Sequence, residues 1–581
     1  MTTRSQNSKP IELNVVGSSV FGRYAKISAE KTYNMFISQD FLVPYAGYKI
    51  AIPSDQLSGN SEGRGIFTST KLDCLIIVIG NQVFRVTINY NQQFEQVIID
   101  DVTNIGTLLT GTGVVYIAEN NKPQVGISDG SYFYIYDPLV SAAIKQVTTL
   151  NFTPGYLTFH DTYFILAASN DNTYIPPANN TWRLSGNNDG TMWPSTSMKV
   201  GLLQTKPDNV QAVVRFPSKG NMILVMGSIV TEAWNDLGLK LFPYARQNQF
   251  NIDYGCLSPA TVAYMDEIVV WLASNEKSGP IIMYSEGGQP KKITTDGIDY
   301  LFSTLQNPED SQAFLYQQDG HLFYHINFYS DNFSLYYDFN TGKFYNACDQ
   351  NLNYFIASEV AFFNNQYYFV TRNNGNIFAF DTAQTTYQDV DNAGNVVINE
   401  IPRFRVCKNI RQASQDYFIV NDIGFTIETG ETNYQNQFQI FNPIQLITQD
   451  EMPLITQGTD VILLLTQDGN LLVDQSNDNL YFQTQQTGED IEYNLIAQQS
   501  ADQSSTQFGF TNKLPRVDLS ISIDGGATFG NEWGYELNSI GLRKNRLMWW
   551  QCGMANDLVC QFKFWGMGRV VITDGVVNIR T

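Results

Sequence analysis

The chain has 581 residues, more than one ordinary domain holds, and 43% of them are hydrophobic, which is enough to form a substantial core. Its formal net charge is −21, from 56 acidic and 35 basic residues. Tight nucleic-acid binding depends on neutralising phosphates with Lys and Arg, so this balance argues against a protein that grips DNA over its surface. It fits either an acidic wall along which DNA slides or plain colloidal solubility.

The beginning of the chain and its apolar runs exclude membrane and export signals. The first ten residues, MTTRSQNSKP, are polar, and runs such as Leu75–Ile79 are of strand length. We therefore expect a soluble protein made in a cytoplasm. The abundance of Tyr (32), Phe (37) and Gly (43) favours strands and turns over helices. Six scattered cysteines without a C-x-x-C pair are expected to be buried and reduced.

One pattern recurs seven times between about residues 65 and 383. An apolar strand meets a short polar turn, and a stronger apolar strand and a third strand follow. The turns lie at residues 71–73, 120–123, 160–161, 217–220, 265–267, 318–320 and 364–365. The spacing averages about 49 residues, and propeller blades repeat at about 40–50. Small sheets that stack around an axis bury both faces, which one such sheet cannot do alone.

The repeat therefore predicts an all-β fold with a β-propeller of six or seven blades over residues 61–385. Residues 1–60 are expected to form an N-terminal arm and lead-in strands. The alternative is an irregular series of β-sandwiches. Apolar residues at helical spacing predict one helix over 296–305, between the fifth and sixth units.

Beyond residue 385 the spacing changes. Val517–Asp524 alternates apolar and polar residues without a break, as a half-buried strand does. We predict a C-terminal β-sandwich formed by residues 386–429 and 513–581. Residues 430–512, rich in Gln, Asn and Asp, are expected to be an inserted, β-rich tip subdomain with a hairpin turning at 467–470. A disordered loop is the alternative for this insertion.

Residues with catalytic or metal-binding chemistry are sparse. His321 and His325 have a spacing that would suit one metal ion on a helix, but a strand separates them by about 13 Å. Gly111-Thr112-Gly113 leads into a strand and is interpreted as a turn, and the chain has no Walker, H-E-x-x-H or G-x-S-x-G motif. We expect no catalytic residue, no metal and no cofactor.

One motif is specific. Residues 522–529, SIDGGATF, match the Asp-box pattern S-x-D-x-G-x-T-[FW], which resembles turns of sialidases and other β-propellers. The carboxylate can accept turn amides, and glycine permits the bend. A structural turn is therefore predicted for Ser522, Asp524, Gly526, Thr528 and Phe529. The alternative is a glycan-binding or glycan-hydrolysing, sialidase-like propeller, but this single box lies outside the repeat and the sequence singles out no nucleophile pair.

Several segments, in order, resemble a known family. They are Tyr33-Asn34-Met35-Phe36, Pro44-Tyr45-Ala46-Gly47-Tyr48, Gly63-Arg64-Gly65, Lys206-Pro207-Asp208, Gly227-Ser228, Thr231-Glu232-Ala233-Trp234, Gly255-Cys256, the 293–305 stretch, Asp524-Gly525 to Phe529-Gly530, and Arg543-Lys544-Asn545-Arg546 before Trp549-Trp550. Together they are similar to the packaged-DNA stabilisation, or tail hub (nozzle), proteins of short-tailed bacteriophages. Collinearity over most of the chain supports the resemblance, and the insertion at 430–512 departs from it.

The resemblance implies a non-enzymatic structural protein of the virion tail that assembles in the cytoplasm of the host bacterium. It implies a ring, expected to have six subunits, below the portal and adaptor, which retains packaged DNA and forms part of the ejection channel. Implied partners are the portal–adaptor proteins, a needle or plug, and fibres or tailspikes, while DNA passes without sequence-specific binding. We also expect part of the acid surplus to face the channel. A protein-interaction scaffold unrelated to phage is a further alternative.

Overall fold

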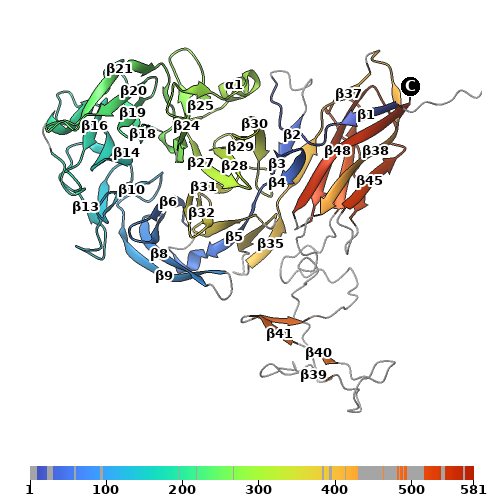
Figure 1. Ribbon diagram of the computed structural model, residues 1–581, viewed down its shortest axis with the longest axis horizontal. Coiled ribbons are helices and arrows are strands. Elements are labelled where there is room, and N and C mark those ends of the chain that lie inside the picture. The colour runs from blue at the N-terminus through green and yellow to red at the C-terminus, as the bar shows by residue number, and fades with distance from the viewer. Residues whose placement is uncertain are drawn as a thin grey trace, which may run out of the picture.

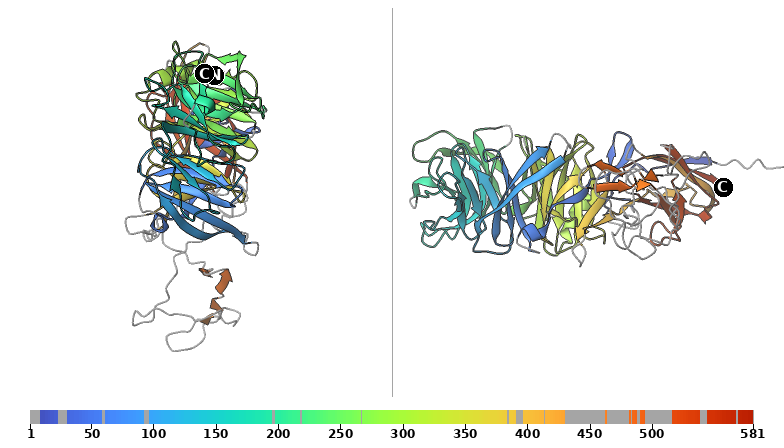
Figure 2. Two further views of the ribbon diagram at one scale, coloured as in Figure 1. Left: turned by 90° about the vertical axis from the view of Figure 1, so that its left-hand side faces the viewer. Right: turned by 90° about the horizontal axis from the view of Figure 1, so that it is seen from below.

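Two β-rich parts lie side by side along the long axis of the computed structural model (Figures 1 and 2). The structure describes residues 9–22, 30–57, 61–91, 96–194, 197–216, 219–265, 267–382, 385–390, 396–412, 414–429, 516–537, 544–566 and 569–580, with short stretches at 462–463, 481–482, 484–487 and 490–493. The predicted all-β class is confirmed. The helix α1 (Asp296–Ser303) lies where the sequence predicts one, and within the described residues no helix is long and apolar enough to cross a membrane.

Seven antiparallel sheets follow one another along the chain, and six of them consist of consecutive strands. The first holds β6 (Gly63–Ser69), β7 (Cys74–Ile79), β8 (Gln82–Asn91) and β9 (Gln96–Thr107). The second holds β10 (Tyr116–Glu119), β11 (Val125–Ser128), β12 (Phe133–Tyr136) and β13 (Lys145–Gln146). The third holds β14 (Thr153–His160), β15 (Tyr163–Ser169), β16 (Thr181–Leu184) and β17 (Val200–Leu202). The fourth holds β18 (Val210–Arg215), β19 (Met222–Gly227), β20 (Thr231–Asp236) and β21 (Tyr244–Ile252).

The remaining three sheets lie nearer the C-terminal part. The fifth holds β22 (Gly255–Cys256), β23 (Ala263–Met265), β24 (Ile268–Ser274), β25 (Ile281–Ser285) and β26 (Lys291–Lys292). The sixth holds β27 (Ser311–Gln318), β28 (His321–Phe328), β29 (Phe333–Asp338) and β30 (Lys343–Ala347). The seventh holds β31 (Ala357–Phe363), β32 (Gln366–Thr371), β33 (Ile377–Asp381) and the N-terminal strand β5 (Gly47–Ile52), and extends through β34 (Thr386–Val390) to β35 (Val396–Glu400).

The seven sheets are the blades of a closed propeller, as Figure 1 shows. Inner strands of successive blades pack together, β6 on β10, β10 on β14, β14 on β18 and β27 on β31. Strand β31 of the last blade also packs on β6 of the first, which closes the ring. Strand β5 precedes the first blade in the chain but completes the last, so the N-terminal segment seals the closure. The predicted propeller is confirmed.

Burial explains which strands the sequence revealed. Strand β7, CLIIVI, is buried along its whole length and gives a strong apolar signal. The residues of the outermost strands β13 (KQ) and β26 (KK) are exposed, and such pairs of polar residues have no strand signature. The three-strand pattern of the sequence therefore corresponds to the inner strands of four-stranded blades.

Both ends of the chain contribute to the C-terminal part. One sheet has the order β3 (Met35–Ser38), β4 (Phe41–Pro44), β48 (Val570–Arg580), β38 (Phe418–Thr429) and β45 (Lys544–Trp550), with β1 (Lys9–Leu13) paired to β48 and β46 (Met554–Ala555) paired to β38. The other continues the sixth blade from β30 through β2 (Lys31–Tyr33), β36 (Arg403–Val406), β47 (Asp557–Trp565), β43 (Arg516–Ser522) and β44 (Trp533–Glu536), with β37 (Ile410–Arg411) paired to β47.

The two sheets share one hydrophobic core. In it the ring centroids of Phe425 and Phe562 lie 4.9 Å apart, and those of Trp549 and Phe562 lie 5.8 Å apart. This arrangement is compatible with the predicted sandwich. The division into domains at residues 60, 385, 430 and 512 stays a prediction.

Only short pairs are described within the insertion, β39 (Ile462–Leu463) with β40 (Tyr481–Phe482) and β41 (Thr484–Thr487) with β42 (Asp490–Tyr493). The hairpin turn predicted at 467–470 lies outside the described residues.

Candidate functional site

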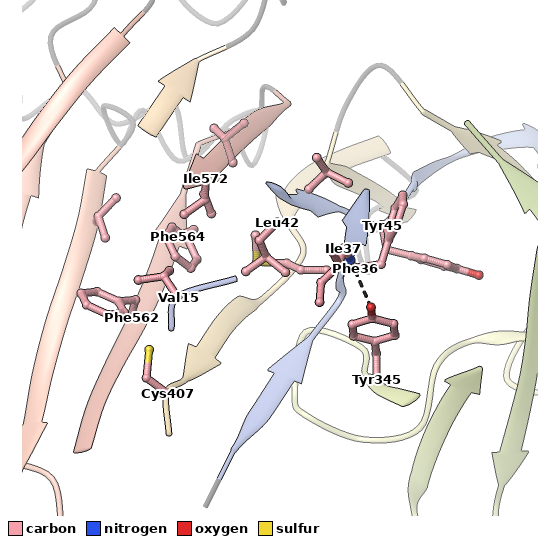
Figure 3. Packing of buried hydrophobic residues seen from close by; sticks show 14 of the residues in the cluster. Val15, Phe36, Ile37, Leu42, Tyr45, Tyr345, Cys407, Phe562, Phe564 and Ile572 are labelled. Carbon is pink, nitrogen blue, oxygen red and sulfur yellow. Dashed lines mark hydrogen bonds between the residues drawn. The ribbon is translucent and has the colours of Figure 1, made fainter. Parts of the chain in front are cut away.

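The N-terminal hairpin β3–β4 forms the edge of a C-terminal sheet that faces the propeller (Figure 3). The Phe36 ring contacts Phe323 of the sixth blade, with centroids 4.9 Å apart, and the backbone N–H of Ile37 donates to the Tyr345 hydroxyl of the same blade at 3.2 Å. Leu42 lies toward Ile572 and Phe564 of the C-terminal strands in the same core. One continuous apolar cluster therefore includes residues of both parts.

Asn34 holds this junction together. Asn34 is buried and its backbone has a positive φ of 52°, a conformation that Asn tolerates better than most residues. The side-chain amide donates to the carbonyls of Cys348 and Pro402 at 3.1 and 2.8 Å, and its Oδ1 accepts the Cys348 N–H at 3.0 Å. The Tyr33–Phe36 segment of the sequence resemblance thus links the sixth blade to the strand that leads into the C-terminal part.

Arg405 ties the N-terminal arm to the core. Its guanidinium is fully buried and donates to the carbonyls of Val15, Ser18 and Asn14 and to the hydroxyl of Thr32 at 2.9–3.3 Å. Glu30 Oε2 neutralises the charge at 2.8 Å. The chain wraps so closely that a Cβ on Gly17 would lie 1.9 Å from Arg405 Nη2. Sequence reasoning missed this residue because its partners lie almost 400 positions away.

Arg64 plays a corresponding part at the start of the propeller. This buried side chain donates to the carbonyls of Gly113, Gly80 and Thr110 at 2.6, 2.9 and 2.8 Å. It thereby holds β6 to the connection between the first and second blades. The neighbouring Gly63 leaves no room for a side chain, since a Cβ there would lie 2.7 Å from Val370 of the seventh blade. The Gly63-Arg64-Gly65 segment is therefore built for ring closure.

Side chains of four blades meet on the axis of the propeller. Glu359 of β31 accepts the Ile66 N–H at 3.1 Å, and burial raises the pKa of this carboxyl to about 8. Tyr116 and Tyr156 lie with ring centroids 4.8 Å apart, and both interact electrostatically with Glu359 and Cys256. The Glu359 carboxyl therefore holds its proton to a higher pH than an ordinary glutamate does. No sequence pattern pointed to this cluster, because its members are about 40 to 240 residues apart.

Two buried carboxylates organise the central segments of the resemblance. Asp208 accepts the N–H groups of Ile229 and Val230 and the Ser228 hydroxyl, and it packs so closely on Gly227 that a Cβ there would lie 2.2 Å from its Oδ2. Glu232 is fully buried. It accepts hydrogen bonds from the Gln204 N–H, the Thr205 N–H and the Thr205 hydroxyl, and it pairs with Arg246 at 3.2 Å. Asp208 and Glu232 therefore stabilise the fourth blade.

The three histidines are engaged within the fold. His160 contacts the Tyr244 hydroxyl at 2.8 Å and the Gly220 carbonyl at 3.0 Å, and His321 contacts Asp338 at 3.0 Å. His325 stacks on Phe314 at 4.8 Å, and burial lowers its pKa to about 3. His321 and His325 both lie on the predicted strand, β28.

Among the described residues, no cluster of three or more His, Cys, Asp or Glu side chains could hold a metal ion. All six cysteines are buried, as expected from their apolar strand contexts.

The predicted Asp-box residues come together in the turn after β43. Asp524 Oδ1 accepts the N–H groups of Ala527 and Thr528 at 3.0 Å, and its Oδ2 accepts the Thr528 hydroxyl at 2.7 Å. The Ser522 hydroxyl donates to Asp524 at 2.6 Å and accepts the Gly526 N–H at 2.8 Å. These hydrogen bonds, that from Ser522 foremost, lower the pKa of Asp524 well below its usual value. Gly526 has a φ of 92°, and Phe529 is half-buried beside the turn.

One shallow cleft combines paired carboxylates with aromatic rings, the combination that a glycan site would use. It lies between the first, sixth and seventh blades and encloses about 360 Å³. Arg372 engages Asp310 at 2.7 Å and Glu62 at 3.4 Å, and stacks over the Tyr329 ring at 4.2 Å. Both carboxylates are thus used to hold Arg372, and the cleft joins blades rather than presenting an acid and a nucleophile.

The family comparison matches the propeller. The family model described as "Bacteriophage P22 Gp10, beta-propeller", a phage stabilisation family, matches residues 34–385, more than half of the chain. The chain belongs to this family. It is therefore a structural protein of a phage tail, and the predicted family is confirmed. The match includes Asn34, Arg64 and Glu359, whereas Arg405 and the Asp-box turn lie outside it.

The other comparisons are more distant. A search of curated proteins finds no match. Solved structures that align include a catalytically inactive virginiamycin B lyase from Staphylococcus aureus, at 10% identity and a TM-score of 0.38 over 58% of this chain and 99% of that one. The N-terminal domain of Nup159 aligns at 10% identity and a TM-score of 0.35, over 60% and 98%. The extracellular domain of BT4673 from B. thetaiotaomicron aligns at 9% identity and a TM-score of 0.36, over 68% and 56%.

Proposed function

We propose that the chain is a non-catalytic subunit of a ring-shaped tail hub, or nozzle, below the portal–adaptor complex. The ring retains packaged DNA and forms part of the ejection channel, and we expect six subunits. The observation that carries the proposal is the family match across a propeller that is closed and fused to a second part through one core. Such a rigid wedge suits a ring, because ring closure sums many weak contacts.

The axial cluster supports a channel between subunits. Tyr116, Tyr156 and Glu359 occupy the axis of the propeller itself, where a duplex would have to displace them. DNA would therefore pass through the lumen that neighbouring copies enclose. The net charge of −21 suits a wall that DNA passes without binding, and we propose that part of the acid surplus lines this lumen.

Assembly with the head-to-tail connector of the same phage tests the proposal. The full chain is mixed with purified portal–adaptor complexes and examined by electron microscopy, with the chain alone and the connector alone as controls. A ring seated below the adaptor is the expected result. A chain that remains monomeric and unbound under these conditions would contradict the proposal, and turnover of a fluorogenic glycoside by the purified chain would contradict the non-catalytic role.

Duplex binding provides an independent check. At physiological salt the isolated chain should not retard double-stranded DNA, because it lacks the cationic surplus needed to displace phosphate counterions. A basic lumen in the assembled ring would contradict the acidic wall.

A further inference from the structure

A pocket of about 270 Å³ lies between the sixth and seventh blades, whose inner strands β27 and β31 are neighbours (Figure 1). Its wall is formed by the end of β27, the turn between β31 and β32, and the paired strands β5 and β33. All of these segments lie inside the region that the family model matches. We call it the Tyr316 pocket, and the wall residues that matter most are Lys49, Tyr316, Asp319, Tyr367, Phe380 and Asp381.

The hydroxyl of Tyr316 points to a ligand. This residue is only 1% exposed, and its buried hydroxyl has no hydrogen-bond partner in the part of the chain that the structure describes. A buried tyrosine hydroxyl ordinarily finds a partner. The ionisable groups that act on it most strongly are Tyr367, Asp319 and Asp381, which all belong to the pocket wall, so the hydroxyl lies on the pocket side. Burial raises the pKa of Tyr316 well above its usual value, and the hydroxyl therefore keeps the proton it can donate.

Aromatic rings form one side of the Tyr316 pocket. The ring of Tyr316 stacks on Phe380 with centroids 4.3 Å apart, and Tyr367 meets the Tyr316 ring edge-on at 4.9 Å. Phe362 lies opposite Tyr367 in the strand register, with ring centroids 4.7 Å apart, and is half exposed. It extends the aromatic surface beyond the pocket. A ligand held here can therefore pack an apolar face on rings while its polar groups meet the other wall residues.

The charges around the pocket balance one another. Arg569 pairs with Asp319, with Nη1 at 3.4 Å from Oδ1. Lys49 is opposite Ala379, two residues before Asp381, so the ammonium and the second carboxylate share one face of the β5–β33 pair. An anion would be repelled by the two carboxylates, and a cation by the ammonium and the guanidinium. The wall therefore suits a neutral ligand whose groups both donate and accept hydrogen bonds.

The shallow cleft at Arg372 differs in this respect. Its Tyr329 hydroxyl donates to Gln312 Oε1 at 2.8 Å, and the Arg372 guanidinium is bound by two carboxylates. The polar groups of that cleft are thus engaged with one another, whereas the Tyr316 hydroxyl is not. The Tyr316 pocket is therefore the stronger candidate for a ligand site, although it is the smaller of the two.

We propose that the Tyr316 pocket binds one neutral hexose unit. A hexose ring has an apolar C–H face, which packs on aromatic side chains, and a rim of hydroxyls, each of which donates and accepts. One such hydroxyl bonds the Tyr316 hydroxyl, and others lie within reach of Lys49 and Asp381. Ligand pockets for drug-sized molecules enclose about 300–1,000 Å³, so this smaller volume suits a single ring. The site binds without hydrolysis, because Arg569 holds Asp319.

Saturation-transfer NMR of the full chain tests the ligand class. Glucose, galactose and mannose are titrated, each beside its uronic acid and its 2-amino sugar. At least one of the three hexoses should bind saturably, and its anionic and cationic counterparts should bind at least about tenfold more weakly, because each meets two like charges in the wall. If none of the three hexoses binds saturably, the hydroxyl is met by water only and the proposal is overturned. A charged counterpart that binds more tightly than its hexose would overturn the neutral assignment.

Two tyrosine variants locate the site. Tyr316→Phe removes only the hydroxyl, so hexose affinity should fall about two- to tenfold, while the Tm should not fall because the hydroxyl has no partner in the described chain. Tyr329→Phe is the matched control. It removes the hydrogen bond to Gln312, so its Tm should fall while its hexose affinity stays at the wild-type value. A Tyr316→Phe chain that binds hexose as wild type does would overturn the site.

Methyl glycosides distinguish the two sources of a hexose unit. A methyl glycoside that binds as tightly as the free hexose supports recognition of the end of a glycan chain. Binding of the free hexose alone supports recognition of a free sugar. The inference goes beyond the proposed hub and does not depend on the ring, because the titrations use the chain by itself. Failure of the chain to assemble on the connector would contradict the hub and leave the hexose site standing.

Discussion

The propeller and the C-terminal part use opposite means of closing a fold. In the propeller, six of seven blades are consecutive strands, and buried charges find partners nearby, as Arg183 does with Asp171 twelve residues away. In the C-terminal part, strands from both ends of the chain pair in one sheet, and Arg405 is held by groups almost 400 residues away. A substitution within one blade is therefore expected to destabilise that blade alone. In the C-terminal part, the junction with the propeller is expected to depend on contacts made by the two ends of the chain.

The largest effect is expected at Arg405. Arg405→Ala leaves Glu30 and several carbonyls of the N-terminal arm without their common donor, and removing one partner of a buried pair costs about 3–5 kcal/mol. Hydrogen exchange should show lost protection at residues 14–22 and 30–38 while the second to fourth blades keep theirs. Arg405→Lys should recover little, because an ammonium cannot reproduce the fork of contacts. Uniform loss of protection in all blades would contradict the proposed difference between the propeller and the C-terminal part.

A smaller, local effect is expected at the buried pair of the third blade. The Arg183 guanidinium donates to both Asp171 oxygens, at 2.6 and 2.8 Å, and both side chains are almost fully buried. Asp171→Asn keeps the shape but leaves the cation unpaired, and a loss of about 3 kcal/mol is expected. Exchange should increase in β15 and β16 only. An equal increase at the N-terminal junction would show that the blades are not independent.

The axial carboxyl gives a pH-dependent contribution. Burial raises the pKa of Glu359 from 4.5 to about 8, so between these values the folded chain keeps a proton that the unfolded chain has released. The free energy of unfolding therefore falls as pH rises from 4.5 to 8, by up to about 1.4 kcal/mol per pH unit. Glu359→Gln should match wild type near pH 4.5 and have the higher Tm at pH 8. Parallel Tm curves for the two proteins would contradict this assignment.

The smallest effect is expected in the C-terminal turn. Asp524→Ala removes the acceptor of four hydrogen bonds in an exposed turn, so the Tm should fall slightly and association with the connector should be unchanged. Thr528→Val, which removes only one of these bonds, serves as the graded control. Loss of a glycan-dependent activity in either variant would favour the sialidase-like alternative over a structural turn.

Prediction from the sequence succeeded where the chemistry is local. The seven apolar repeats, the helix at α1 and the strand at His321 and His325 follow from residues within a few positions of one another. Prediction from the sequence missed β11, a strand of only four residues that includes Gly126. It also missed the exposed outer strands. Asn34 and Arg64 were noticed only as parts of a family resemblance, since the groups that bind them lie 16 to 368 residues away.

The sequence by itself determined that the chain consists of small antiparallel sheets in series, because the period of apolar strands and turn residues is written in neighbouring positions. Only the tertiary structure decided that β5 seals the last blade, that Arg405 holds the N-terminal arm, and that Glu359 meets Tyr116 and Tyr156 on the axis. These contacts depend on which distant segments share a core. A linear pattern does not encode that pairing, because the energy of a buried charge or a sealed edge depends on neighbours that the fold alone brings together.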